Sequence, residues 1–187
     1  MDAFEYLSVL ISIVLGLALT QLLTSVGRLV QARSRVRAFW PSFAWTGTVL
    51  LILVQTWWAI FTFRDEPVWN FGEFALILAH PTLIYFLAVL VLPDADREGT
   101  IDLRANYFAQ KTWFFGAAAG VVVLSLLRPV VFDGYFPLDA DRLVQFAFLL
   151  MTSAAALVRS PRLHQALAFA APVGVLLYTA GLFFSLS

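Results

Sequence analysis

The stretch FEYLSVLISIVLGLALTQLLTSVG, residues 4–27, decides the fold class of this protein. It is apolar almost throughout, and Glu5 is its only charged residue. A helix needs about 20 such residues to cross the roughly 30 Å hydrocarbon core of a bilayer. No basic segment precedes the stretch and no small-residue cleavage site follows it, so we expect a retained transmembrane helix rather than a cleaved signal peptide.

The rest of the chain repeats this pattern. Of its 187 residues, 61% are hydrophobic and 13% are charged, whereas soluble domains have about 45–50% and about 25%. A soluble protein of this size would have to expose large apolar patches. We therefore predict an all-α, polytopic membrane helical bundle, a single transmembrane domain over residues 1–187 with no strand pattern. Six transmembrane helices are predicted, at about residues 4–27, 41–63, 74–92, 112–127, 143–158 and 163–186.

The fourth and fifth spans are the shortest. Their apolar runs reach only about 24 Å at 1.5 Å per residue, so they must thin the bilayer, extend through their flanks or lie inside the bundle. Arg128 and Pro129 are expected to close the fourth span. Asp139 or Asp141 is expected to cap the fifth. Residues 101–111 are predicted to form a short interfacial helix that runs into the fourth span.

The arginines predict the orientation of the bundle, because positive charge is retained on the cytoplasmic side. With both termini outside (N-out/C-out), nine of the twelve basic residues fall in inner loops, and eight of the twelve acidic residues fall outside. The inner basic residues are Arg28, Arg33, Arg35, Arg37, Arg97, Arg104, Lys111, Arg159 and Arg162.

Composition and motifs disfavour several functional classes. The chain has no cysteine and a formal net charge of zero, which removes thiolate chemistry and any net basic field for nucleic acid. No phosphate loop, HExxH or GxSxG motif is present. His80 and His164 are predicted at opposite depths, which argues against a haem held by both. We expect no catalytic residue, no metal ion, no cofactor and no nucleic-acid partner, although an enzyme stays the least favoured of three classes.

Small residues recur at four-residue intervals along the first span, at Ser8, Ser12, Gly16, Thr20 and Thr24. Such a row forms a groove on one helix face and lets another backbone approach closely. We call this row the small-residue face. It predicts close helix packing, either within the bundle or between the copies of a homo-oligomer.

Two prolines lie inside predicted spans. Pro81 follows His80 in the third span and leaves the carbonyl of Ile77 without its helical donor, so we expect a kink there. Pro172 is expected to kink the sixth span in the same way. An ionisable side chain at membrane depth, such as His80, is a candidate functional residue.

Other polar residues are predicted to reach a depth similar to that of His80. We expect them to form one polar vestibule that opens to the outer face, with local hydrogen bonds at a kink as the alternative. The predicted vestibule consists of Gln55, His80, Ser125, Arg128, Tyr178 and Thr179.

The loop after the first span carries a basic cluster, Arg28, Arg33, Arg35 and Arg37. These arginines set the topology, and each is able to attract an anionic lipid headgroup by about 1 kcal/mol. The lipid bilayer is thus the predicted partner, with anionic headgroups as a further one.

Four groups of residues stand out together: FEYLSVLISIVLGL at 4–17, Arg35-Val36-Arg37 leading to Trp40, QTWWA at 55–59, and Asp102-Leu103-Arg104 followed by WFFG at 113–116. In these groups the chain resembles a family of uncharacterised bacterial multi-pass membrane proteins. The resemblance covers the first two-thirds of the chain. It implies a bacterial source and a multi-pass inner (plasma) membrane location, and it brings no activity and no site residues.

The sequence as a whole favours a small channel or transporter for an ion or small solute, based on the predicted vestibule and the interior prolines. The alternative is a non-catalytic interaction, sensing or assembly subunit that oligomerises through the small-residue face. The two proposed functions make different predictions: a channel or transporter requires the polar residues to line one cavity, whereas an assembly subunit does not.

Overall fold

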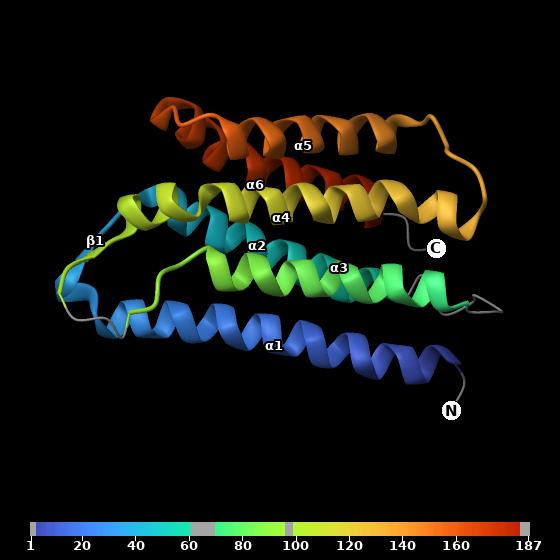
Figure 1. The fold of residues 1–187 in the computed structure, drawn as a ribbon, viewed down its shortest axis with the longest axis horizontal. Coiled ribbons are helices and arrows are strands. Elements are labelled where there is room, and N and C mark those ends of the chain that lie inside the picture. Colours follow the sequence, from blue (N-terminus) through green and yellow to red (C-terminus); the bar gives the residue numbers. More distant parts are fainter. Residues whose placement is uncertain (1–2, 61–69, 96–98, 184–187) are drawn as a thin grey trace.

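The computed structural model describes residues 3–60, 70–95 and 99–183. The helices run side by side in an up-and-down order, with α1 along one edge of the bundle and α5 along the opposite edge (Figure 1). The close helix pairs are α1 with α3, α3 with α4, α4 with α5, and α2 with α6. The helices are α1 (Ala3–Gln31), α2 (Trp40–Ala59), α3 (Phe71–Leu90), α4 (Leu103–Phe132), α5 (Ala140–Leu157) and α6 (Pro161–Phe183).

The predicted all-α membrane bundle with six long helices is confirmed, and five of the described helices are long and apolar enough to cross a membrane. The remaining helix, α2, has 20 residues and is not among these five. The mean hydropathy of α2 is lowered by Gln55 and by four tryptophans, Trp40, Trp45, Trp57 and Trp58. The five apolar spans are Glu5–Gln31, Phe71–Leu90, Leu103–Phe132, Ala140–Leu157 and Pro161–Gly181.

The main correction to the predicted spans concerns α4. This helix is 30 residues long: the helix predicted at residues 101–111 begins at Leu103 and runs into the fourth span, as expected. It also continues through Arg128 and Pro129 to Phe132, so the prediction that these two residues close the span is wrong. A proline inside a helix removes one backbone hydrogen bond and frees one carbonyl. That carbonyl has a substitute donor from α5, described below.

Side-chain caps begin three of the helices. Asp139 accepts a hydrogen bond from the backbone N–H of Arg142, which confirms the predicted cap of α5. Asp102 caps α4 by accepting a hydrogen bond from the backbone N–H of Ala105. At α3, Asn70 and Glu73 form a reciprocal capping box. Each cap satisfies N–H groups that a helix start leaves without partners.

A minimal sheet ties two loops together at one end of the bundle. After the short 3₁₀ helix η1 (Arg33–Arg35), strand β1 (Val36–Arg37) pairs in parallel with β2 (Ile101–Asp102), with Val36 opposite Ile101 and Arg37 opposite Asp102. The sequence shows no strand pattern, and these two-residue strands leave the all-α class unchanged. Two residues per strand are too few to produce a recognisable alternation.

Candidate functional site

A central cavity of about 450 Å³ lies among the six described helices, with Ile11 as the lining residue from α1. Because the helices alternate in direction (Figure 1), the C-terminal parts of α2, α4 and α6 meet the N-terminal parts of α3 and α5 at one end of the cavity. We call this the polar end and the opposite one the Trp45 end. The lining of the whole cavity includes Trp45, Thr48, Ile52, Gln55, Ile77, His80, Pro81, Leu87, Ala118, Val121, Ser125, Arg128, Asp141, Arg142, Gln145, Phe148, Met151, Thr152, Ala171, Val175 and Tyr178.

Five of the six residues of the predicted vestibule line this cavity. They come from four different helices: Gln55 from α2, His80 from α3, Ser125 and Arg128 from α4, and Tyr178 from α6. The sixth residue does not line it. Thr179 is next to Tyr178 in α6, and its hydroxyl donates to the carbonyl of Val175 in the same helix, 2.8 Å away.

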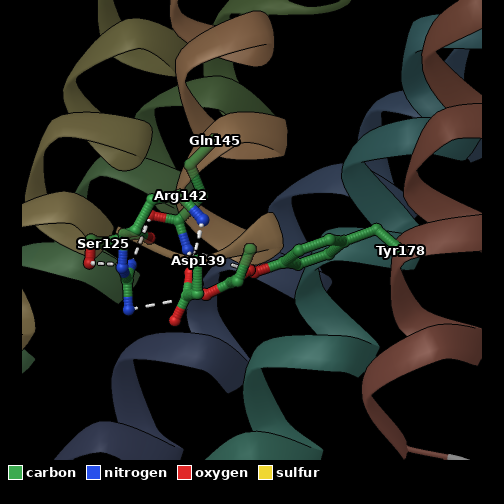
Figure 2. A network of polar contacts seen from close by, with 6 residues as sticks. Ser125, Asp139, Arg142, Gln145 and Tyr178 are labelled. Carbon is green, nitrogen blue, oxygen red and sulfur yellow. Dashed lines mark hydrogen bonds and ion pairs between the residues drawn. The ribbon is translucent and has the colours of Figure 1, made fainter. Parts of the chain in front are cut away.

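A polar network, formed by Asp141, Arg142, Gln145 and Tyr178, occupies the polar end. Figure 2 shows Arg142, Gln145 and Tyr178 of this network. Arg142 donates to the amide oxygen of Gln145 at 2.7 Å and is 3.4 Å from the carboxylate of Asp141. The amide nitrogen of Gln145 donates to Asp141 at 3.0 Å and to the hydroxyl of Tyr178 at 3.2 Å. Through Gln145 the network joins α5 to α6.

Arg142 also joins α5 to α4 through the backbone. One of its guanidinium nitrogens donates to the carbonyl of Ser125 at 3.4 Å (Figure 2). In a regular helix this carbonyl would accept from the residue four positions later, which here is Pro129 and has no N–H. Arg142 therefore replaces the donor that Pro129 lacks. The side chain of Ser125 contributes nothing to this bond, because its hydroxyl donates back to Val121.

Sequence reasoning gave Arg142 no role in the vestibule and took Asp141 for a possible cap. The sequence does indicate that a free carbonyl needs a donor, because a proline inside an apolar span frees the carbonyl four residues before it. No sequence signal indicates which side chain reaches that carbonyl, because Arg142 and Ser125 lie on different helices.

Three buried side-chain atoms have no hydrogen-bond partner among the described residues, and all three belong to residues that line the central cavity. At the polar end these are Oδ1 of Asp141 and Nε of Arg142, an acceptor and a donor on neighbouring residues. At the other end it is Nε1 of Trp45. Buried polar atoms are normally satisfied by a partner, and these three are closed off from the open space of the cavity.

The Trp45 end is bounded by an aromatic cluster, which we define as Phe39, Tyr107, Phe108, Phe114 and Phe115. Trp45 packs edge-to-face on both Phe114 and Phe115. A second void of only about 10 Å³ lies beyond Trp45. The rings therefore close this end of the cavity.

His164 is embedded against the aromatic cluster and is 0% exposed. Its Nε2 lies 2.9 Å from the carbonyl of Val158, which can only accept, so Nε2 carries the proton. Nδ1 then accepts from the hydroxyl of Tyr107 at 3.0 Å. Both ring nitrogens are thus used in holding the α5–α6 connection to α4. Nearby, buried Lys111 donates to the carbonyl of Ala156 at the end of α5.

The interior prolines lie in continuous helices. Pro81 lines the central cavity from α3, as does Ile77, the residue whose carbonyl it leaves without a helical donor. Pro172 lies inside α6. The kinks expected at Pro81 and Pro172 stay predictions.

The small-residue face points away from this chain's own core. Ser12, Gly16, Thr20 and Thr24 are exposed, and Ser8 is half-buried. A side-chain carbon added at Gly16 would meet no atom within 4 Å. Packing inside the bundle uses another face of α1, and an oligomer interface on the small-residue face stays a prediction.

The basic cluster has partners within the protein. Arg28 lies 3.4 Å from Asp94, and Arg35 donates to the carbonyls of Gly99 and Ala95. Arg33 donates to the carbonyl of Val30. The contacts of Arg28 and Arg35 hold the loop between α3 and α4 against the end of α1. Contact with lipid headgroups stays a prediction, with Arg37 as the fourth, exposed member.

Among the described residues no group of three potential metal ligands comes together. Comparison with known proteins found no matching protein family, no matching curated protein and no matching solved structure. The class of this protein therefore follows from its own helices. Its apolar spans make it an integral, multi-pass membrane protein whose lipid-facing surface surrounds a partly polar central cavity.

Proposed function

We propose that this protein is a carrier that binds a small solute in the central cavity and moves it across the membrane. The observation that carries the proposal is the cavity of about 450 Å³ among the six described helices, with the polar network at one end. Solute sites lie typically in such concave, largely apolar spaces with a few convergent polar groups. In membrane proteins, polar and ionisable residues facing the interior commonly mark a solute pathway.

The closed Trp45 end favours a carrier over an open channel. A channel needs a continuous pathway, whereas here Trp45, Phe114 and Phe115 interlock at one end of the cavity. A carrier opens its central site to one side at a time. In this proposal the polar end is the open side, which the partly exposed side chains of Asp141 and Arg142 support.

We further propose a bacterial inner-membrane location, with the polar end facing outwards. This orientation rests on the arginine distribution. The chain contains no cysteine, so single substitutions report accessibility without background. A cysteine in place of exposed Tyr135 is expected to react with a membrane-impermeant thiol reagent in intact cells, whereas Ser34→Cys is expected to react only after permeabilisation. The reverse pattern would show that the orientation is inverted.

Thiol labelling of single cysteines placed in the cavity lining tests the carrier function. Ser125→Cys near the polar end is expected to react with a small impermeant thiosulfonate applied from outside, because its position lines the open cavity. Thr48→Cys, which lines the cavity nearer the Trp45 end, is expected to react also when the reagent is applied only to the inside of sealed vesicles. The second reaction requires the cavity to open to that side.

Ala155→Cys is the matched control, because Ala155 is fully buried and does not line the cavity. We expect the thiol reagent to label Ala155→Cys at least tenfold more slowly than it labels either cavity variant. A rate for Ser125→Cys as low as that of Ala155→Cys would mean that the cavity is closed to water and would overturn the proposal. Equally slow labelling of Thr48→Cys from the inside would exclude transport.

A further inference from the structure

Most polar side chains that line the central cavity already use their hydrogen-bonding groups within the protein. The hydroxyls of Thr48, Ser125 and Thr152 donate to carbonyls of their own helices. The amide of Gln145 is used on both of its sides within the polar network, the oxygen as an acceptor and the nitrogen as a donor. These groups are therefore not offered to a solute.

The charged side chains of the lining are engaged as well. Asp141 and Arg142 lie 3.4 Å apart and compensate each other's charge. Arg128 also has a partner within the protein. An ion that enters the cavity gives up its hydration, and transfer of an ion into largely apolar surroundings is costly unless an opposite charge receives it. The described lining residues hold their charges in contacts of their own, so the cavity disfavours a charged solute.

Three side chains of the lining differ from all of these. They are Gln55 and Thr56 of α2 and His80 of α3, and we call them the open polar set. Each is half-buried, and none makes a side-chain hydrogen bond within the described part of the chain. Their polar atoms are not among the buried, unpartnered atoms described above, so a molecule of the size of water is able to reach them. The open polar set therefore offers unused hydrogen-bonding groups to the content of the cavity.

The chemistry of these three groups specifies what they bind. An amide offers two donors and one acceptor, a hydroxyl offers a donor and an acceptor, and a neutral imidazole offers one of each. A carboxamide or an alcohol matches such a set, because it both donates and accepts. A carboxylate has no proton to donate, and an ammonium has no lone pair with which to accept. The neighbouring wall consists of apolar side chains such as Ile52, Ile77 and Val121, which suit an apolar body.

We propose that the central cavity selects an uncharged small molecule with one hydrogen-bonding end and an apolar body, and that the open polar set binds the hydrogen-bonding end. The cavity volume of about 450 Å³ lies within the range of roughly 300–1,000 Å³ that is typical of small-molecule sites. This inference rests on the proposed solute-binding function and specifies its substrate class.

The test uses full-length Ser125→Cys protein in lipid nanodiscs at neutral pH and measures how strongly a probe slows the reaction with the thiosulfonate. Two series of probes are matched in size and differ in charge: benzamide, benzoate and benzylamine, and pentanamide, pentanoate and pentylamine. We expect each amide to protect with an apparent affinity at least tenfold higher than that of its charged counterparts, because the ions lose hydration without compensation. Tyr135→Cys, at an exposed position after α4, is expected to react at the same rate with and without each probe.

Two substitutions locate the hydrogen-bonding end of the probe. Gln55→Leu and His80→Leu, each made in the Ser125→Cys background, keep an apolar side chain in the lining and remove the polar atoms. Each is expected to weaken protection by benzamide about fivefold, as the loss of one hydrogen bond requires, while the labelling rate without probe is unchanged. Gln165→Leu makes the same replacement at an exposed position of α6 outside the lining and is expected to leave protection as it is.

Each contrary outcome overturns a defined part of the inference. Equal protection by benzamide and benzoate would refute selection of an uncharged solute. Unchanged protection in both Gln55→Leu and His80→Leu would refute the role of the open polar set. If Ser125→Cys reacts from outside while neither amide protects it, the substrate class is wrong and the solute cavity stands. If Ser125→Cys does not react, the proposed function itself fails.

Discussion

Replacing Arg142 by leucine is expected to lower the free energy of unfolding by about 3 kcal/mol. The side chain of Arg142 is only 13% exposed and that of Asp141 is 26% exposed, so the variant leaves a largely buried carboxylate without its counter-charge. It also removes the donors to Gln145 and to the carbonyl of Ser125. Interhelical hydrogen bonds in membranes average about 0.6 kcal/mol each, so the unpaired charge accounts for most of the loss. Equilibrium unfolding of the protein in bicelles measures it.

Pro129 offers a specific test of why Arg142 reaches the backbone of α4. Pro129→Ala restores an N–H that is able to donate to the carbonyl of Ser125 within the helix. In that background, Arg142→Leu is expected to cost about 1 kcal/mol less than in the unmodified protein, because the carbonyl no longer depends on Arg142. Additive effects of the two substitutions would contradict the substitute-donor role. Arg162→Leu, at an exposed position, serves as the control and is expected to change stability by less than about 0.5 kcal/mol.

His164→Leu is expected to have the second largest effect, a loss of about 2 kcal/mol. Leucine fills a similar volume but leaves the hydroxyl of Tyr107 and the carbonyl of Val158 without their partner in a site that is closed to water. It also removes an aromatic ring that contacts Tyr107, Phe108 and Phe115. The same unfolding measurement in bicelles checks this value.

Tyr107→Phe separates the hydrogen bond from the packing. It keeps the ring and removes only the donor to Nδ1 of His164, so about 1 kcal/mol is expected. A loss as large as that of His164→Leu would mean that the Tyr107 hydroxyl, and not the Val158 contact, holds the α5–α6 connection. Labelling of Ser125→Cys in the His164→Leu background is expected to be unchanged, since His164 does not line the central cavity.

The spans were predictable because a bilayer imposes a simple length requirement on each of them. The apolar runs around residues 4–27 and 163–186 correspond to α1 and α6, which differ from prediction by a few residues at Gln31 and at Pro161, while residues 184–186 lie outside the described part of the chain. The errors arose at prolines and at short segments. Pro129 resembles a helix end in sequence, but α4 continues because α5 supplies a replacement donor. The β1–β2 pair is too short to leave any pattern.

The candidate site was predictable in part, for a similar reason. Depth along a span follows from counting residues, and equal depth was enough to group Gln55, His80 and Ser125, which line the same cavity. Helix rotation does not follow from counting in a helix that is apolar on all sides. Thr179 therefore lies beside the cavity instead of in its lining, and the small-residue face of α1 turned out to be exposed.

The sequence by itself determined that the chain is a membrane protein and approximately where its long helices lie, because the bilayer acts on each helix separately and through its composition. Only the tertiary structure decided which helices are neighbours and which side chains meet. The bond of Arg142 to the carbonyl freed by Pro129, and the unpartnered atoms of Asp141 and Arg142, depend on α4, α5 and α6 packing together. Packing between apolar helices in lipid is set by shape and by a few polar contacts, and these leave little trace in the sequence of any one helix.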